Sequence, residues 1–308
     1  IDPAMLAKVY ESPEVTGTIT AEAAALTGLK EGTIVVGGAG DNAAAAVGTG
    51  VVEDGRAFAT IGTSGVVFAH TDKLSIDPKG RVHTFCCAVP GAWHVMGVTL
   101  AAGQSLKWYR DNFCDADKVE AEKQGVDPYD LMTAEAAKTP IGSNRLIYLP
   151  YLMGERTPHL DPDCRGAFVG LSGMHTRYDL VRAVMEGVTF SLRDCAEILR
   201  GMGVQSDVIL ACGGGGSSAF WRQMMADILG CPVATTISKE GPALGVAILA
   251  GVGAGLYPSV PEACRQIIGV NASQDPVAEH VAEYDKFYEI YRGLYPALKD
   301  SWHKLAEL

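Results

Sequence analysis

One carboxylate among glycines is the residue of this sequence best placed to do chemistry. Asp41 follows a glycine cluster at 37–40, between an apolar run of strand type at 33–36 and an alanine-rich run of helix type. Glycines let the backbone turn sharply and let a ligand approach it closely. The start of a helix favours a carboxylate, so Asp41 is interpreted either as a helix cap or as a general base at the edge of a cleft.

Two further glycine segments could hold phosphate groups. The segment 62–65 (GTSG) joins β-type runs at 57–61 and 66–70, which predicts a hairpin whose hydroxyls and N–H groups could surround phosphate oxygens or simply form a turn. The four glycines 213–216 follow a buried-type strand and precede a helix, where N–H groups favour an anion. Because glycines give no packing and cost backbone entropy, we predict that a ligand lies against this second turn.

The elements that must position these segments follow from hydrophobic patterning. In the last third of the chain, strands at 208–212 and 233–236 alternate with helices at 218–229 and 242–250, which indicates parallel strands covered by helices. Further strands are expected at 82–89 and 93–98, and further helices at 101–113, 130–138, 176–200 and 277–305. The link 48–55 is the candidate domain boundary.

The stretch 151–170 is long and rich in proline, glycine and charge. Loops of this length are usually functional or disordered, and three aromatic residues favour function. Glu155, Arg156 and His159 are expected to form ion pairs that shape an exposed loop.

Composition excludes several classes of protein. The 308 residues carry a formal net charge of −11, which argues against a partner that is a nucleic acid or an anionic membrane. No apolar run reaches the ~20 residues of a membrane span. The eight cysteines show neither C-x-x-C pairs nor zinc-type spacing, so we expect reduced cysteines in a cytoplasmic protein.

The segment 38–43 (GAGDNA) also fits the G-x-G-x-x-A fingerprint of dinucleotide-binding proteins. That fingerprint needs a second strand that ends in an acid about 20 residues later. Here the next strand belongs to the hairpin, and Glu53 and Asp54 arrive too early. An NAD-dependent oxidoreductase is therefore kept only as an alternative.

In this order, these segments resemble the C-terminal part of sugar kinases of the FGGY family. The resemblance covers nearly the whole chain, and 165–186 follows a family signature closely. Its stretches are 40–44 (GDNAA), 62–65 (GTSG), 93–97 (WHVMG), 102–108 (AGQSLKW), 154–162 (GERTPHLDP), 165–171 (RGAFVGL), 179–186, 213–230 and 240–245 (EGPALG). The run 154–162 resembles the members that act on xylulose.

The resemblance implies an α/β fold of actin and hexokinase type (ribonuclease H-like), with a mixed sheet flanked by helices. It implies that 1–52 is the tail end of a first, sugar-binding domain and that 53–308 is a second, nucleotide-binding domain. It also implies that the N-terminal half of the kinase, which holds the rest of the first domain, is missing from this chain. The expected substrates are ATP with Mg²⁺ and D-xylulose or a related ketose or polyol. Two copies could form a homodimer.

Site residues also follow from the resemblance. Asp41 would be the base that takes the proton of the attacking sugar hydroxyl, and could contact the metal only through water. Thr63 would face the ATP phosphates, and Cys212 stands where glycerol kinases have an acid. The nucleotide-binding residues implied are Gly62, Thr63, Ser64, Gly103, Leu106, Lys107, Gly213, Gly214, Gly215 and Ser218.

Because most sugar-binding residues of the family lie in the missing part, we expect no sugar kinase turnover from this chain alone. A non-catalytic nucleotide-binding module of actin fold remains the main alternative.

Overall fold

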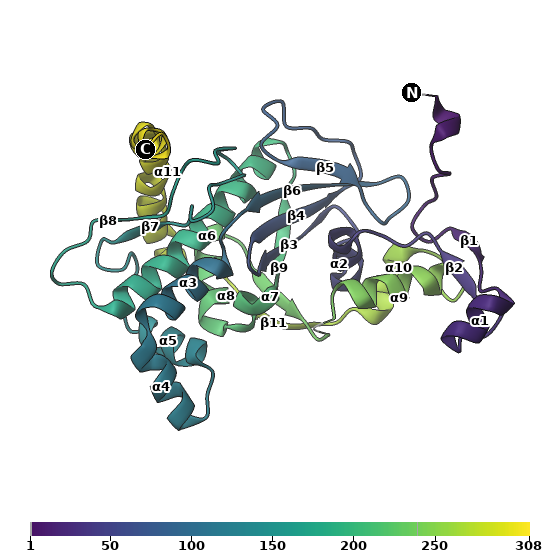
Figure 1. Cartoon of the computed structure of the whole chain (residues 1–308), viewed down its shortest axis with the longest axis horizontal. Coiled ribbons are helices and arrows are strands. Elements are labelled where there is room, and N and C mark those ends of the chain that lie inside the picture. The colour runs from purple at the N-terminus through teal and green to yellow at the C-terminus, as the bar shows by residue number, and fades with distance from the viewer. Residues whose placement is uncertain (1, 239) are drawn as a thin grey trace.

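A seven-stranded mixed sheet with helices on both faces forms the centre of the molecule (Figure 1). The computed structural model describes residues 2–238 and 240–308. β10, β9 and β3 run parallel, and the other neighbours pair antiparallel. In spatial order the strands are β11 (Val270–Gln274), β10 (Val233–Thr236), β9 (Ser206–Cys212), β3 (Gly55–Ile61), β4 (Gly65–Thr71), β6 (Trp93–Thr99) and β5 (His83–Cys86).

Alternate residues of β3 supply the two faces of the sheet, as the period of a strand requires. Ala57, Ala59 and Ile61 belong to the core that includes α6, whereas Phe58 belongs to a separate cluster with Ala46. The first face is covered by α3 (Gly103–Phe113), α6 (Arg177–Gly201), α8 (Ala219–Leu229) and α11 (Ala278–Ala306). The other carries α2 (Asp41–Thr49), α9 (Pro242–Gly253) and α10 (Val260–Ile267).

α2 and α9 touch backbone to backbone. A Cβ atom on Gly48 would lie 1.9 Å from the carbonyl oxygen of Gly241, and one on Gly245 would lie 1.9 Å from that of Ala44. Only glycine allows this approach, so the two helices hold each other in one relative position. Asp41 is the first residue of the helix that is fixed in this way.

The remaining elements are smaller. β1 (Val15–Thr18) and β2 (Ile34–Val36) form an antiparallel pair outside the main sheet, joined through α1 (Ala21–Thr27) and preceded by the 3₁₀ turn η1 (Pro3–Met5). α4 (Asp115–Gln124) and α5 (Pro128–Ala136) project beside α3 (Figure 1). β7 (Ile147–Leu149) pairs with β8 (Ala167–Val169), and α7 (Gly213–Ser217) follows β9.

The predicted hairpin and the alternating last third are present, but some elements differ from the expectations. The helix expected at 130–138 is α5, which begins two residues earlier because the side chain of Asp127 accepts a hydrogen bond from Tyr129 N. α4 and α10 were not predicted. α4 is mostly charged and has little apolar periodicity, which is why the pattern gave no signal. In the described residues, no helix combines the length and apolarity needed to cross a bilayer.

The expectation of an exposed, ion-paired loop around Glu155 is wrong. The Glu155 residue is only 2% exposed and accepts hydrogen bonds from Thr99 Oγ1 at 2.6 Å and Leu100 N at 2.9 Å. Thr157 N also donates to Val98 O, so this segment packs against the end of β6 that β5 leaves free. Burial raises the pKa of Glu155 to about 7, against the opposing effect of the Thr99 hydrogen bond.

This buried carboxyl makes folding depend on pH. The pKa rises from 4.5 to about 7 on folding, so the folded state binds the proton more tightly, and the free energy of unfolding falls as the pH rises through this window. The fall amounts to about 3 kcal/mol. Glu155→Gln should remove this contribution, so the difference in stability between about pH 5 and about pH 8, measured by urea unfolding, should be about 3 kcal/mol smaller than in the parent.

Glu289→Gln, at a side chain that is 76% exposed, is the matched control and should keep the pH dependence of the parent. The interpretation is wrong if Glu155→Gln retains the same pH dependence.

Candidate functional site

Two of the three predicted glycine segments, 62–65 and 213–216, meet at a cavity of about 500 Å³. Its walls come from the tip of the β3–β4 hairpin, the first turns of α3, and α7 with the start of α8. Eight of the ten predicted nucleotide-binding residues line it: Gly62, Thr63, Gly103, Leu106, Lys107, Gly214, Gly215 and Ser218. The other two, Ser64 and Gly213, do not line it but adjoin lining residues in the chain.

Backbone hydrogen bonds hold the hairpin tip against α3. Gly103 N donates to Gly62 O at 2.7 Å, while Ala102 N and Gln104 N both donate to Thr63 O at 3.0 and 3.2 Å. The N–H groups at the start of α3 are therefore used within the protein. The exposed side chain of Thr63 remains as a donor toward the cavity.

The four glycines 213–216 form a short helix, α7, and most of them have a packing role that the sequence analysis had ruled out. A Cβ on Gly213 would lie 2.7 Å from Ile61 O, one on Gly215 would lie 2.5 Å from Ile61 Cγ2, and one on Gly216 would lie 2.9 Å from Ala211 C. Gly214 alone has no atom within 4 Å of such a Cβ, and it lines the cavity. Of these four glycines, Gly214 is the one beside which a ligand would find open space.

Sequence reasoning missed one wall of the cavity. α5 contributes Tyr129, Asp130 and Thr133, and the guanidinium of Arg110 lies 4.5 Å from the Tyr129 ring centroid. The Asp-Pro start of this helix is readable in the sequence, but nothing in its spacing showed that the helix faces the glycine segments. Trp221 is buried at the base, where its Nε1 donates to Thr189 Oγ1 at 3.0 Å.

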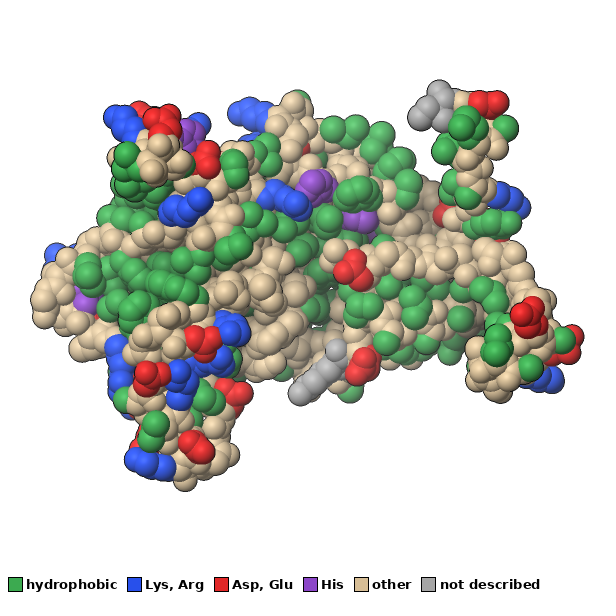
Figure 2. Space-filling model, viewed as in Figure 1, with side chains coloured by type: hydrophobic (Ala, Val, Ile, Leu, Met, Phe, Trp, Pro, Cys, Tyr) green, Lys and Arg blue, Asp and Glu red, His purple; other side chains and the backbone are tan. Residues whose placement is uncertain are grey.

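Charge near the cavity is mixed. Lys107 lines it and pairs with Asp111 at 2.5 Å. Figure 2 shows Lys and Arg side chains gathered among acidic ones over α3, α4 and α5, on a chain whose net charge is −11. The net charge of the protein would therefore repel a phosphate, and any attraction to this cavity would have to come from nearby groups.

Asp41 does not line the cavity. Gly40 is the N-cap of α2, and Asp41 is the first helical residue, exposed, with Oδ1 accepting from Asn42 N at 2.8 Å. Ala45, one turn later, packs against the buried cluster that includes Phe58 and Leu210 of the sheet. Since residues four apart share a helix face, Asp41 begins the face of α2 that is turned toward the sheet.

The dinucleotide alternative is wrong. A Rossmann unit needs two parallel strands in one sheet, joined by the helix that carries the fingerprint. Here α2 connects β2 to β3, but β2 pairs only with β1, in a different sheet from β3.

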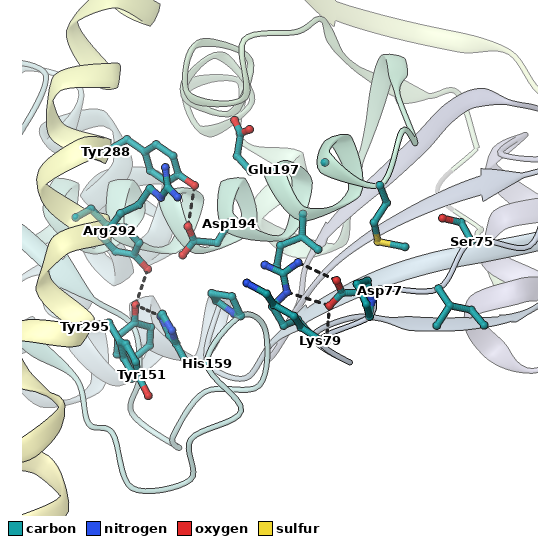
Figure 3. Close-up of a pocket in the computed structure, with 18 residues that line it drawn as sticks. Ser75, Asp77, Lys79, Tyr151, His159, Asp194, Glu197, Tyr288, Arg292 and Tyr295 are labelled. Atoms are coloured by element: carbon teal, nitrogen blue, oxygen red, sulfur yellow. Dashed lines mark hydrogen bonds and ion pairs between the residues drawn. The ribbon is translucent and has the colours of Figure 1, made fainter.

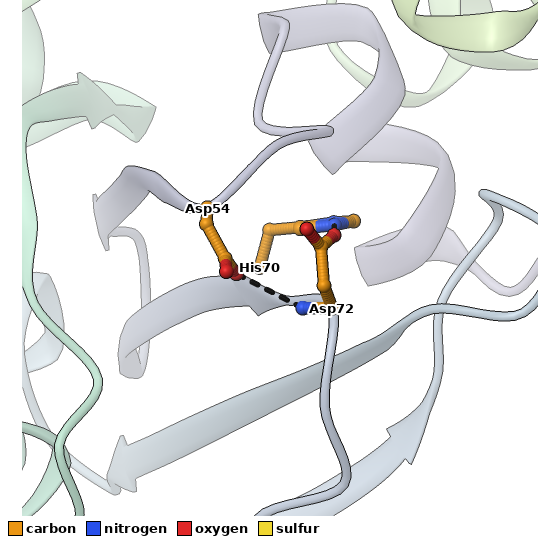
Figure 4. A group of neighbouring side chains, drawn as sticks. All are labelled: Asp54, His70 and Asp72. Atoms are coloured by element: carbon orange, nitrogen blue, oxygen red, sulfur yellow. Dashed lines mark hydrogen bonds and ion pairs between the residues drawn. The ribbon is translucent and has the colours of Figure 1, made fainter.

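Among the described residues, two groups of acidic and histidine side chains have the proximity that a metal site needs. In the first, Asp54, His70 and Asp72 bring ligand atoms within 4.8 Å of one another (Figure 4). They also satisfy one another, because His70 Nε2 lies 3.1 Å from Asp72 Oδ1 and Asp72 N donates to Asp54 Oδ1 at 2.9 Å. His70 lies near the end of β4 opposite the hairpin tip, so the group is not part of the cavity. The second group, Asp161, Asp163 and His303, ties the 151–166 segment to α11.

Two family models match most of this chain. The C-terminal domain of the FGGY family of carbohydrate kinases matches residues 57–254, and the N-terminal domain of that family matches residues 1–48. The chain belongs to the FGGY family of carbohydrate kinases. The resemblance inferred from the sequence is thereby confirmed.

Among FGGY relatives, the xylulose kinase of Bacillus subtilis is 39% identical over 292 residues, which cover 95% of this chain and 56% of that protein. The gluconokinase of Bacillus subtilis is 33% identical, covering 100% of this chain and 60% of its own length. The crystal structure of ligand-bound xylulose kinase from Lactobacillus acidophilus superposes with a TM-score of 0.90 at 30% identity, over 99% of this chain and 60% of that one. The predicted actin- and hexokinase-like fold is confirmed, and the chain spans little more than half the length of these FGGY proteins.

Gly103→Ala tests the backbone contact that shapes the cavity. Its Cβ would lie 2.5 Å from Gly62 O, so we expect the hairpin tip to be displaced and the protein destabilised by roughly 1–3 kcal/mol. The measurement is chemical unfolding. Gly214→Ala is the control, because its Cβ enters open space, and equal stability of the two variants would contradict the contact.

Proposed function

We propose that this chain provides the ATP-binding part of a kinase that phosphorylates a sugar hydroxyl, with D-xylulose as the sugar. The observation that carries the proposal is the convergence of the hairpin tip, the start of α3 and α7 on one cavity, in a chain of the FGGY family. Two relatives named xylulose kinase support the choice of sugar. Gluconate is the comparison substrate, because a gluconokinase is also similar.

Residues 53–308 form the nucleotide-binding domain in this proposal, and 1–52 belong to a sugar-binding domain. Exposed apolar side chains in residues 1–52 support this division, since Met5, Val9 and Leu26 are 78%, 88% and 82% exposed. Apolar surface of this kind is usually covered by further protein. The eight cysteines are all unpaired, which supports a reducing compartment such as the cytoplasm.

The proposed chemistry is in-line phosphoryl transfer. ATP would lie in the cavity, with its phosphates toward Thr63 and the hairpin tip. Asp41 would accept the proton of the attacking hydroxyl, and Oδ2 is open for this because Oδ1 is engaged by Asn42 N.

A magnesium ion at this site would have few protein ligands. Asp41 and Thr63 offer exposed oxygens, which suits an ion that keeps most of its waters. The ion would neutralise phosphate charge, and the residues of the chain would supply position and the base.

Asp41→Asn separates a kinase from a non-catalytic nucleotide-binding module. With the sugar domain present, kcat for D-xylulose should fall about 10²–10⁴-fold, while the affinity for ATP changes little. Asp115→Asn, at a side chain that is 85% exposed on α4, should leave both unchanged. Unaltered turnover in Asp41→Asn would show that Asp41 is not the base.

Gly214→Ala tests the nucleotide site directly. A methyl group at this position occupies the space where ATP would lie, so the Kd for ATP, measured by calorimetry, should rise about tenfold or more. Gly293→Ala in α11 also meets no atom within 4 Å and should not change the Kd. Equal ATP affinity of the two variants would place the nucleotide elsewhere.

A further inference from the structure

A second cavity of about 570 Å³ lies away from the proposed ATP site (Figure 3). It is enclosed by the last turns of α6, by α11, by the segment 75–81 between β4 and β5, and by residues from 151 to 159. It shares no lining residue with the first cavity. Its volume is within the range of small-molecule sites.

One wall is built of aromatic rings that are already tied to one another. Tyr151 OH donates to Tyr291 OH at 3.2 Å and lies 3.1 Å from His159 Nε2. The His159 ring stacks on Tyr295 with centroids 3.5 Å apart and planes inclined by 6°. This wall is therefore pre-formed and offers ring faces to a ligand.

Asp194 on α6 is the polar group at the back of the cavity. It is 7% exposed, and its Oδ1 accepts from Tyr288 OH at 2.7 Å. Among the described residues Oδ2 accepts no hydrogen bond, and Asp194 lines the cavity. Burial raises the pKa of Asp194 to about 7, and the Tyr288 hydrogen bond opposes that rise. Oδ2 is free to accept a hydrogen bond from water or from the hydroxyl of a ligand in the cavity.

Lys79 and Arg292 face the cavity from opposite walls (Figure 3). In the part of the chain that the structure describes, Lys79 has no ion-pair partner, and Arg292 has only a 4.0 Å contact with Glu289.

The remaining charges of the lining are already compensated. Arg81 is held by both oxygens of Asp77, at 2.9 and 2.8 Å. Glu197 is paired with Arg193 and Arg200 at 3.4 and 3.0 Å. The cavity therefore presents two available cations, one open carboxylate oxygen and a wall of rings.

We propose that this cavity binds a phosphorylated sugar or polyol at a second, non-catalytic site. The phosphate lies between Lys79 and Arg292, and a hydroxyl of the ligand donates to Asp194 Oδ2. The two cations favour an anionic group such as a phosphate and disfavour an amine. The open oxygen of Asp194 favours a ligand that also carries a hydroxyl donor, and the aromatic wall favours a carbon skeleton. A sugar phosphate combines these three features, whereas inorganic phosphate has no carbon skeleton. The proposal does not depend on the kinase activity.

Calorimetry on the 308-residue chain tests the site with D-xylulose 5-phosphate, D-xylulose, inorganic phosphate and AMP as probes. We expect the sugar phosphate to bind at least about tenfold more tightly than each of the others. Lys79→Gln combined with Arg292→Gln should weaken it about tenfold or more, and Asp194→Asn, which keeps an acceptor for Tyr288, about fivefold or more. Gly214→Ala should leave this affinity unchanged.

Several outcomes overturn the proposal. These are no binding of the sugar phosphate at about 10 mM, equal binding of inorganic phosphate, equal or tighter binding of AMP, or affinity that is retained in the Lys79→Gln, Arg292→Gln variant. Loss of sugar-phosphate affinity in Gly214→Ala would assign the binding to the first cavity. Thermal melts confirm that each variant is folded, and Gly293→Ala, which meets no atom within 4 Å, serves as the control on α11.

Discussion

Close backbone contact at the end of β3 is the constraint on which the candidate site depends. Ile61 is approached by Gly213 and Gly215, and Gly62 O accepts a hydrogen bond from Gly103 N. Three segments far apart in the chain meet there because none of these glycines carries a Cβ. The cavity is what remains beside this contact, so its shape is fixed by packing before any ligand arrives.

A similar contact fixes the carboxylate. α2 and α9 approach through Gly48 and Gly245, and this sets the position of the helix that begins with Asp41. Asp41 is exposed and outside the cavity, so a substrate that reaches both must lie between them. This arrangement suits a base that acts on an acceptor held by another part of the protein, as in the proposed transfer.

The two cavities differ in how they are prepared for a ligand. The first is lined by the glycine segments and by side chains that include Thr63, Lys107 and Tyr129. Its hydroxyl groups and its lysine would suit a phosphate-bearing ligand. The second is lined by polar side chains that have few partners within the described residues, because Asp194 Oδ2 accepts no hydrogen bond there and Lys79 forms no ion pair. The buried Glu155, by contrast, has its donors within the protein and serves to fasten the 154–161 segment to β6.

The sequence by itself determined the family, because its motifs and their order resemble those of FGGY kinases, and this resemblance implied the mixed α/β fold and eight residues that line one cavity. Glycine segments and alternating apolar runs, which are local signals, located the hairpin and the parallel strands. Only the tertiary structure showed why glycines are needed at 213–216. Gly213 and Gly215 pack directly against Ile61, about 150 residues earlier in the chain, and this contact leaves no room for a Cβ atom. It also decided that Glu155 is buried, that α5 forms a wall of the first cavity, and that Lys79, Asp194 and Arg292 line the second. Each of these depends on contacts between distant segments, and local pattern carries no information about which segments pack together.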